Sequence, residues 1–340
     1  MIKEVKVMAD KNLENLLSEY EQKRRKAQMD AEESLAKLYE QFPGLEEIDD
    51  ELNKYAISKS KAILSGKNDL KEYDSLINAL KKKKENFLQE KQIDINLYKP
   101  KYDCKDCNDT GYIQDENNKS IMCHCLKQRL LNLLYNKSNL SDIKSKTFDN
   151  FNLNLFSDEV NVKKNKIKCS PRQNILNIKN ASIKFIENFD DLEEKNLFFC
   201  GNTGLGKTYM SNAIANEILK KGKTVLYQTA PVLLETVIDG KFNKYKNQNA
   251  DEFYKNVLTV DLLIIDDLGT ENINSMTVSE LFTILNTRIL NLNNKPTKTI
   301  ISTNLSIEQI FKIYEERIGS RIAGYYNIYQ FVGEDLRLKR

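Results

Sequence analysis

The 340-residue sequence has little glycine and proline and contains no long apolar run. Its 12 glycines and 5 prolines exclude a collagen-like chain and argue against a linker-rich or largely disordered one. No stretch approaches the roughly 18 apolar residues of a membrane span, and the mixed-charge N-terminus lacks the apolar core of a signal peptide. We therefore expect a cytoplasmic protein that has no membrane partner.

Charged residues are abundant but nearly balanced in sign. Lys and Arg number 52 and Asp and Glu 49, which gives a net charge of +3, and the basic excess lies within residues 100–180. This excess predicts only a modest general attraction to polyanions such as nucleic acids. Hydrophobic residues make up 40% of the sequence, which is enough to build a sizeable core in part of the chain.

The chain divides into four segments of different character. Residues 1–99 are highly charged and carry thin apolar stripes at three- and four-residue spacing, which predicts helices. Two interpretations remain open for them, a solvated helical hairpin and a protein-docking module. Residues 100–135 hold a cysteine cluster, and residues 136–180 form a polar linker with an apolar anchoring patch. Residues 181–340 alternate apolar strands with amphipathic helices, a pattern typical of an α/β domain with a parallel sheet.

A complete phosphate-loop motif is the most specific feature of the sequence. An apolar strand over residues 196–200 leads directly into G-x-x-x-x-G-K-T, and an amphipathic helix follows. Glycines let backbone N–H groups surround a phosphate, and the helix N-terminus adds a favourable dipole. The lysine would neutralise the β- and γ-phosphates of ATP, and the threonine hydroxyl would hold Mg²⁺. The loop comprises Gly201, Asn202, Thr203, Gly204, Leu205, Gly206, Lys207 and Thr208.

A second apolar strand, over residues 262–265, ends in the acidic pair Asp266-Asp267. Ligands of open α/β sheets bind at the carboxyl ends of the strands, so this pair would face the phosphate loop. We expect Asp266 to bind Mg²⁺, mostly through water, and Asp267 to polarise the water that attacks ATP. A solvated turn or a helix cap is the alternative interpretation, and the phosphate loop upstream favours the catalytic one.

Further candidate residues lie near the C-terminus. A third apolar strand ends at Ser302-Thr303-Asn304, where Asn304 would hydrogen-bond the attacking water or the γ-phosphate, or simply begin a loop or cap a helix. Arg321 and Arg337 lie beyond it. Single arginines near helix ends are most often surface charges, but these two occupy places where an oligomeric ATPase needs cations.

The cysteine cluster has the spacing of a metal site. Cys104 and Cys107 form a C-x₂-C pair, and Cys123 and Cys125 form a C-x-C pair 15 residues later. Four thiolates in this arrangement can close a tetrahedral, structural zinc site. His124 is an alternative ligand, but in an extended segment it would point away from its neighbours, which favours four cysteines. A redox dithiol and unligated thiols remain less favoured alternatives.

Together these motifs resemble the bacterial AAA+ helicase-loader family of the DnaC/DnaI type, which includes the IstB-like transposon ATPases. The resemblance rests on residues 201–208, 262–269, 302–304 and 316–321, and on the lead-in over residues 147–151. The cysteine pattern is similar to that of zinc-bearing loaders of clostridia and their phages. The resemblance implies an AAA+ P-loop parallel-sheet domain over residues 181–340, preceded by an α-helical N-terminal region and a small zinc knuckle.

The resemblance also implies a function. Loaders of this family use ATP to hold the hexameric, DnaB-type replicative helicase and place it on single-stranded DNA, and residues 1–99 would bind that helicase. By resemblance, Arg321 would reach the nucleotide of a neighbouring subunit as an arginine finger, which requires self-association or ring stacking. Arg337 would touch the γ-phosphate of its own subunit. Asp267 stands where related ATPases carry Glu, so we expect slow hydrolysis that partners stimulate.

Other functions remain as alternatives. An IstB-like transposition ATPase would share the ATPase half but usually lacks the cysteine segment. A nucleotide-gated adaptor with little turnover is the second alternative, because Asp267 is shorter than Glu. A small-molecule kinase is disfavoured, since neither lid arginines nor an acceptor pocket is evident. Basic and aromatic residues alternate over 241–246, which suggests either a DNA contact or an ordinary surface loop.

Overall fold

The structure, a computed structural model, describes residues 2–65, 70–135, 145–162, 168–242, 248–291 and 296–339. Contacts divide the chain into two units, Leu17–Ile121 and a second unit that comprises Met1–Leu16 with Met122–Arg340. Most of the basic and aromatic segment 241–246 falls outside the described residues. Among the described residues, no helix combines the length and the apolar character needed to cross a membrane.

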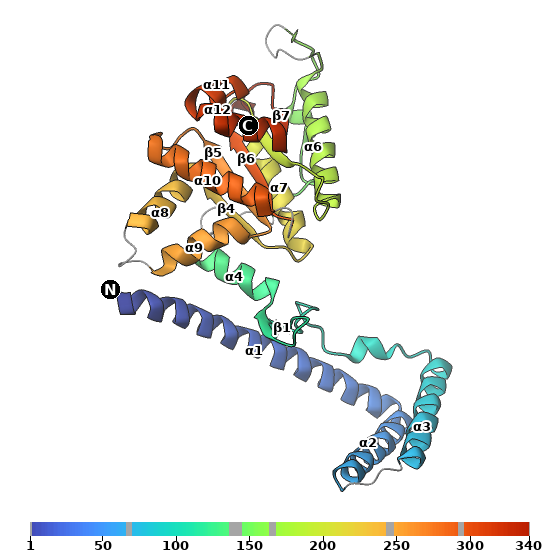
Figure 1. Ribbon diagram of the computed structural model, residues 1–340. Coiled ribbons are helices and arrows are strands. Elements are labelled where there is room, and N and C mark those ends of the chain that lie inside the picture. The colour runs from blue at the N-terminus through green and yellow to red at the C-terminus, as the bar shows by residue number, and fades with distance from the viewer. Residues whose placement is uncertain are drawn as a thin grey trace. The chain divides into compact units, whose positions relative to one another are not determined.

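The N-terminal part of the chain is helical, as predicted. Its helices are α1 (Ile2–Gln41), α2 (Pro43–Leu64) and α3 (Lys71–Glu90), and a 3₁₀ turn follows at Ile95–Tyr98. Helices α2 and α3 pack side by side as a hairpin (Figure 1). Proline at the first helical position begins α2 and so separates this helix from α1. Helix α3 buries no side chain, which agrees with its thin apolar stripe.

The cysteine segment has little regular structure. Two short strands, β1 (Tyr112–Gln114) and β2 (Ser120–Met122), pair as a small hairpin, and α4 (His124–Leu134) follows. Cys123 lies at the N-cap of α4, so residues 124 and 125 are helical. The extended conformation expected for this stretch is therefore wrong, and the alternation argument that separated His124 from its cysteine neighbours does not hold.

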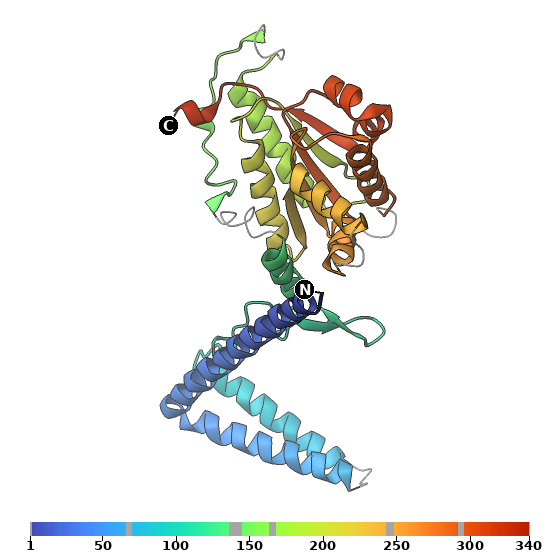
Figure 2. The ribbon, with the colours of Figure 1, turned by 90° about the vertical axis from the view of Figure 1, so that its left-hand side faces the viewer.

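A five-stranded, fully parallel sheet forms the centre of the second unit. Its strands are β3 (Asn196–Cys200), β4 (Val225–Thr229), β5 (Leu262–Leu268), β6 (Lys298–Thr303) and β7 (Tyr326–Gln330). Their order is β4-β5-β6-β3-β7, which places the phosphate-loop strand β3 beside β6. Helices cover both faces of the sheet (Figure 2), and this arrangement confirms the predicted α/β fold.

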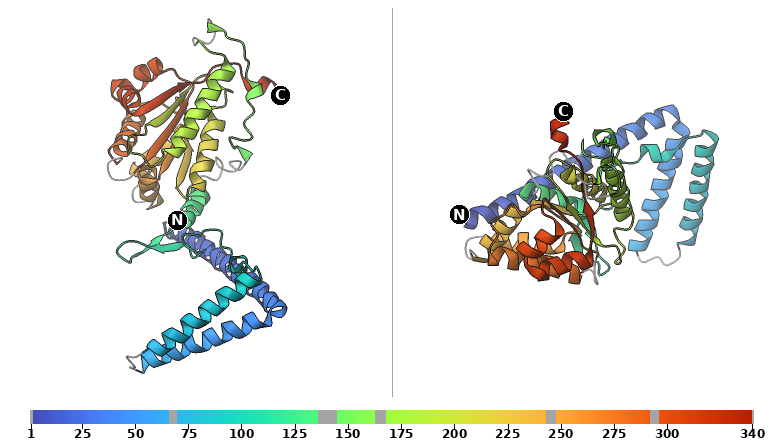
Figure 3. Two further views of the ribbon diagram at one scale, coloured as in Figure 1. Left: turned by 90° about the vertical axis from the view of Figure 1, so that its right-hand side faces the viewer. Right: turned by 90° about the horizontal axis from the view of Figure 1, so that it is seen from above.

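Helices α6 and α7 cover one face of the sheet and α8 to α12 the other (Figure 3). Their bounds are α6 (Pro171–Glu187), α7 (Lys207–Lys220), α8 (Ala230–Phe242), α9 (Gln248–Thr259), α10 (Ser275–Asn291), α11 (Ile307–Ile313) and α12 (Glu315–Tyr325). Short 3₁₀ turns lie at Leu153–Leu155 and Leu336–Lys339.

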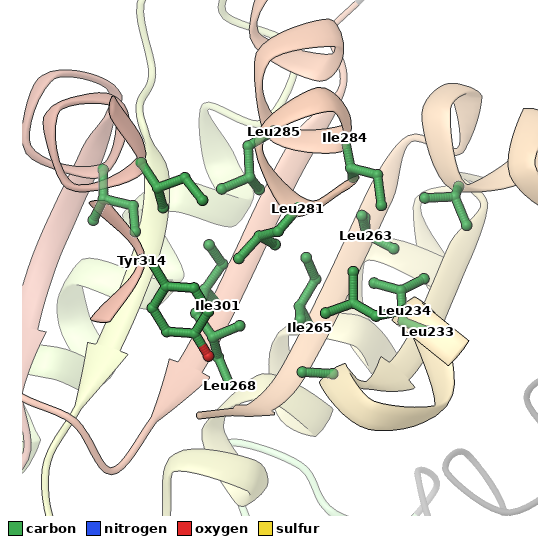
Figure 4. Close-up of a cluster of buried hydrophobic side chains, with 14 of the residues drawn as sticks. Leu233, Leu234, Leu263, Ile265, Leu268, Leu281, Ile284, Leu285, Ile301 and Tyr314 are labelled. Carbon is green, nitrogen blue, oxygen red and sulfur yellow. The ribbon is translucent and has the colours of Figure 1, made fainter. Parts of the chain in front are cut away.

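Alternation along each strand builds two separate cores. Leu197 and Phe199 of β3 pack with α6 and α7, whereas Phe198 and Cys200 face α8 to α12. Successive strand residues point to opposite faces, so one strand supplies both cores. Figure 4 shows the second core, in which leucines and isoleucines of α10 meet those of β5 and β6. Cys200 belongs to the same core and is only 5% exposed.

A fully buried arginine ties α10 to the end of the sheet opposite the phosphate loop. Arg288 donates from Nε to Thr299 Oγ1 at 2.9 Å and from Nη2 to the Lys298 carbonyl at 2.7 Å. Its Nη1 donates to the carbonyls of Val257 and Val260 at 2.8 and 3.1 Å. Burial lowers the pKa of Arg288 to about 10, so the guanidinium stays charged at neutral pH. Four acceptors compensate it where water is excluded.

The lead-in to the sheet is anchored by aromatic side chains. Phe148 and Phe156 are buried in the core formed with α6 and α7, as the apolar patch in this linker predicted. Leu155 of the same patch is 40% exposed instead. Helix α6 begins at Pro171, capped by the hydroxyl of Ser170, so the boundary expected at residue 181 falls inside a helix. The composition of this helix is polar overall, and only one face of it is apolar and buried. For this reason the sequence placed its first half in the polar linker.

Candidate functional site

The phosphate loop connects β3 to α7 in a conformation that requires glycine. Gly201, Gly204 and Gly206 have φ angles of 137°, 73° and 90°, in the region that side chains disfavour. A Cβ atom on Gly201 would lie 2.3 Å from the carbonyl oxygen of Phe331. The chain therefore approaches the loop too closely for any residue but glycine at this position.

Lys207 is the first residue of α7 and is only 6% exposed. Its Nζ donates to the carbonyls of Gly201 and Asn202 at 2.6 and 2.7 Å, and to Asn304 Oδ1 at 2.8 Å. Burial lowers the pKa of Lys207, although the nearby acidic pair opposes this effect. The ammonium group therefore has three oxygen acceptors, and phosphate oxygens of a nucleotide can take their place.

Asp266 lies near the carboxyl end of β5, beside the first turn of α7. Its Oδ2 accepts from Thr208 Oγ1 at 3.1 Å and from the Tyr227 hydroxyl at 2.6 Å. Its Oδ1 accepts from the Ser302 hydroxyl and from the backbone N–H of Asp267, the latter at 3.1 Å. Thr208 and Asp266 thus lie within hydrogen-bonding distance of each other, which places both beside the position predicted for one Mg²⁺ ion.

Asp267 follows in a left-handed conformation, with φ of 55°. This turn directs the residue into the same cavity that Lys207 and Asn304 line. Burial raises the pKa of Asp267, and the negative charge of Asp266 raises it further, while Lys207 and Arg337 oppose both effects. The two carboxylates therefore have different surroundings, one saturated with hydrogen-bond donors and the other facing the cavity.

A cavity of about 390 Å³ extends from the phosphate loop. One wall, beside Gly206 of the loop, is aromatic: the Phe151 ring stacks on Phe156 with centroids 5.8 Å apart and meets Tyr209 edge-on at 5.1 Å. This wall can accept a flat ring such as a nucleotide base. It was not predicted as part of the site, because only the fold brings the lead-in against α7. The lining residues are Lys146, Asn150, Phe151, Asn152, Leu155, Phe156, Thr203 to Tyr209, Asp267, Asn304, Leu336 and Arg337.

The C-terminal segment completes the cavity. The Phe331 N–H donates to the Cys200 carbonyl at 2.7 Å, and the Leu336 N–H donates to the Gly204 carbonyl at 3.0 Å. These bonds hold the segment against the phosphate loop and bring Arg337 to the cavity wall.

Arg321 lies on α12 and is not among the residues that line this cavity. Its Nε donates to Asn286 Oδ1 at 3.0 Å, and its guanidinium lies 6.0 Å from the centre of the Phe282 ring. Arg317 lies over the same ring at 5.0 Å and pairs with Glu315 at 2.9 Å. Of the predicted nucleotide-site residues, the structure therefore brings all but Arg321 around the phosphate loop.

The four predicted zinc ligands come together. The sulfur atoms of Cys104, Cys107, Cys123 and Cys125 all lie within 4.8 Å of one another. A tetrahedral zinc ion with Zn–S bonds of about 2.3 Å separates its sulfurs by about 3.8 Å, so the donor set fits this ion. The Asp109 carboxylate supports the first pair, since it accepts from the Cys104 N–H at 2.9 Å.

His124 remains a second possible ligand. Its imidazole forms another compact group with Cys104 and Asp106, again with ligand atoms within 4.8 Å of one another. Zinc prefers thiolate sulfur and imidazole nitrogen, and four cysteines already complete its usual coordination number. Four cysteines are therefore the preferred ligands, because they supply the full number of donors that zinc needs. Strand alternation plays no part in this choice.

Fold and site together define an AAA+ P-loop domain with the elements of an ATP-binding protein. Residues 134–323, more than half of the chain, match the family of IstB-like ATP binding proteins. The chain belongs to this family.

Individual relatives agree with this assignment. The chain is 26% identical over 158 residues to the replicative helicase loader DnaC of Escherichia coli strain K12, covering 46% of this chain and 60% of the relative. It is 33% identical over 138 residues to the chromosomal replication initiator protein DnaA of Buchnera aphidicola, covering 40% and 30%. It is 26% identical over 234 residues to the phage-like element PBSX protein XkdC of Bacillus subtilis, covering 65% and 79%. The matched part thus spans less than two thirds of DnaC and of DnaA.

Solved structures give matches of the same kind. The crystal structure of the DnaC helicase loader has a TM-score of 0.44 and 22% identity, over 56% of this chain and 99% of that one. The crystal structure of DnaI has a TM-score of 0.43 and 22% identity, over 56% and 93%.

Proposed function

We propose that this protein is an ATP-dependent loader that binds a hexameric, DnaB-type replicative helicase and delivers it to single-stranded DNA. The ATP-dependent part of the proposal rests on the convergence of Lys207, Asp266, Asp267, Asn304 and Arg337 on one phosphate loop. The chain adds to this site a helical unit and a four-cysteine group. The similarity to the E. coli helicase loader supports the choice of partner.

ATP hydrolysis follows from the roles of the chain's own groups. Lys207 would exchange its present carbonyl partners for the β- and γ-phosphate oxygens. Mg²⁺, held by Thr208 and through water by Asp266, supplies charge neutralisation when bound. Asp267 accepts a proton from the attacking water, and Asn304 orients that water or the γ-phosphate. Asp267 is one methylene shorter than Glu, which supports slow turnover.

A second subunit completes the proposed site. Arg337 reaches the cavity of its own chain, whereas Arg321 lies outside it on α12. We therefore assign Arg337 to the γ-phosphate of the same subunit and Arg321 to that of a neighbour. An arginine supplied in trans stabilises the transition-state charge and couples hydrolysis to assembly.

The remaining parts of the chain have proposed structural and docking functions. Residues 1–99 would bind the helicase, and the four cysteines of residues 100–135 would hold a structural zinc ion. Residues 136–180 would link the knuckle to the ATPase domain at 181–340. A closed set of four protein ligands leaves no position for substrate, so this zinc would stabilise the fold and not catalyse.

Two alternatives rest on particular observations. The family match supports an IstB-like transposition ATPase, because it covers residues 134–323 and does not include the helical region. The short side chain of Asp267 supports an adaptor that binds nucleotide with little hydrolysis.

Co-purification with the host's replicative helicase tests the proposal. We expect size-exclusion chromatography with light scattering to detect a complex of the full chain whose stability differs between ATP and ADP. Deletion of residues 1–99 should abolish it, and Lys207→Ala should abolish the nucleotide response alone. No complex under any nucleotide, with DNA binding intact, would instead support the transposition ATPase.

A further inference from the structure

A tyrosine outside the phosphate-loop and acidic-pair motifs contacts the predicted Mg²⁺-binding carboxylate. Tyr227 lies in β4, and its ring is buried in the core that α6 and α7 share with the sheet. Thr229 of the same strand pairs with Asp266 across the ladder, so Tyr227 lies two residues before that level. The phenol spans this difference, and its hydroxyl donates to Asp266 Oδ2 at 2.6 Å.

The Asp266 carboxylate is saturated with donors. An ionised carboxylate has about four lone-pair positions, and four donors occupy them here: Tyr227 and Thr208 on Oδ2, and Ser302 and the Asp267 N–H on Oδ1. Such a set fixes the rotation of the carboxylate about its Cβ–Cγ bond.

Of the two donors on Oδ2, Tyr227 is the one that has no predicted part in binding nucleotide or metal. Its ring is packed in the core, so its hydroxyl has a fixed position beside Asp266. Thr208 is different, because its hydroxyl would turn to Mg²⁺ when nucleotide binds, which frees a lone pair of Asp266 Oδ2 for the metal's bound water.

We propose that Tyr227 is a positioning residue for Mg²⁺, whose hydroxyl holds the Asp266 carboxylate in the orientation that receives the metal's bound water. The inference rests on the proposed nucleotide binding and deepens it. Mg²⁺ demands near-ideal octahedral geometry and retains several waters, so a rotated carboxylate would fit its hydration shell poorly. Residues that orient metal ligands in this way change metal affinity by about 10- to 100-fold when removed.

A purely structural function for Tyr227 predicts something different. The residue is only 2% exposed, so loss of its hydroxyl would lower stability whether or not it orients Asp266. Tyr314 provides a matched control because it is also fully buried and also donates to a carboxylate, that of Glu271. Neither Tyr314 nor Glu271 lines the nucleotide cavity.

The experiment measures the Mg²⁺ dependence of nucleotide binding with the full chain and a fluorescent ATP analogue. For Tyr227→Phe, we expect the Mg²⁺ concentration at half-maximal binding to rise about tenfold. Binding of the analogue in excess chelator should stay within about twofold of wild type. Tyr314→Phe should lower the denaturation midpoint and leave the Mg²⁺ midpoint unchanged.

The outcomes separate this inference from the proposed function. A Tyr227→Phe midpoint within twofold of wild type, or an equal shift in Tyr314→Phe, overturns the inference while leaving the proposed function intact. A wild-type chain that binds no nucleotide, with or without Mg²⁺, overturns both. If Tyr227→Phe does not fold, 3-fluorotyrosine incorporated at position 227 preserves the hydroxyl. Its ¹⁹F resonance should shift when Mg²⁺ joins the nucleotide complex, and an unchanged resonance contradicts the inference.

Discussion

The Lys207 ammonium donates a 2.8 Å hydrogen bond to Asn304 Oδ1 and so joins the phosphate loop to the residue that follows β6. These two residues are 97 positions apart in sequence, and β3 and β6 are neighbours in the sheet. Asn304 is thereby held on the wall of the cavity where the γ-phosphate of ATP would lie. From this position Asn304 can act on the reacting phosphate and not on the nucleotide base.

Replacement of Asn304 should therefore separate binding from hydrolysis. For Asn304→Ala we expect nucleotide affinity within about threefold of wild type, because Lys207 keeps its carbonyl partners until phosphate replaces them. The hydrolysis rate should fall about 100-fold, the usual loss when one preorganised polar group at a transition state is removed. Equilibrium binding and single-turnover hydrolysis check this. Equal losses in both would show that Asn304 only shapes the loop.

The ionised side chain of Asp267 should lower the folding stability at neutral pH while serving hydrolysis. Its folded-state pKa is raised, chiefly by burial and next by Asp266, so the folded chain holds this proton more tightly than the unfolded chain. Stability from this proton is present in acid and is lost as the pH rises through the folded pKa. Asp267→Asn should therefore raise the denaturation midpoint at pH 7, and the difference should vanish below the ordinary Asp pKa of about 3.9.

The same variant should hydrolyse ATP at least about 100-fold more slowly, since the general base is gone. Thermal denaturation from pH 3 to pH 8, alongside hydrolysis assays, checks both effects. A midpoint at pH 7 below that of wild type would contradict the assigned pKa direction. Unchanged hydrolysis would remove Asp267 from the proposed mechanism.

The position of Arg321 predicts complementation between subunits. Lys207→Ala should bind no nucleotide, and Arg321→Ala should bind nucleotide but hydrolyse it about 1000-fold more slowly, as expected for a lost arginine finger. In a mixture, an Arg321→Ala subunit supplies the intact phosphate loop and a Lys207→Ala subunit supplies the arginine. We expect part of the activity to return in the mixture, measured with helicase and single-stranded DNA present.

Arg317→Ala is the matched control, because Arg317 lies on the same helix over the same Phe282 ring. It should lose little activity alone. If mixed Lys207→Ala and Arg321→Ala chains stay inactive, the assignment of Arg321 to a neighbouring subunit is wrong.

Features that short sequence motifs encode could be predicted from the sequence. Features that depend on contacts between distant residues could not. The phosphate loop and the acidic pair follow a strand in short sequence patterns, so both were predicted with the parallel sheet around them. Tyr227 could not be predicted, since in sequence it is one more apolar residue of a buried strand. Only the β4–β5 register, with Thr229 opposite Asp266, places its hydroxyl at the acidic pair.

In the cysteine segment the long-range grouping was predicted, but the local conformation was not. Spacing alone grouped its four cysteines, but the conformation that carries Cys123 and Cys125 is a helix start and not a strand. A C-x-C pair has no periodicity long enough to distinguish the two.

Arg288 should be a sensitive position for the stability of the ATPase domain, because it is fully buried. Arg288→Lys keeps the charge but offers one nitrogen in place of three, and so leaves buried carbonyls such as Val257 and Lys298 without donors. Each unsatisfied buried group costs about 1–3 kcal/mol, so we expect unfolding free energy to fall by roughly 2–5 kcal/mol. Urea denaturation checks this, with the exposed Arg317→Lys as the control. A change within 0.5 kcal/mol, the usual range for surface substitutions, would contradict it.

Metal removal should affect the cysteine segment and leave the nucleotide site intact. We expect about one zinc ion per chain by mass spectrometry of the purified protein, as a set of four cysteines implies. Cys104→Ser should lose the zinc, whereas Cys169→Ser should keep it, because Cys169 lies outside the four-cysteine group. His124→Ala should also keep it if four cysteines are the ligands. In each case nucleotide affinity should stay within about twofold of wild type, because none of these residues lines the cavity. Zinc retained in Cys104→Ser but lost in His124→Ala would instead identify the imidazole as the ligand.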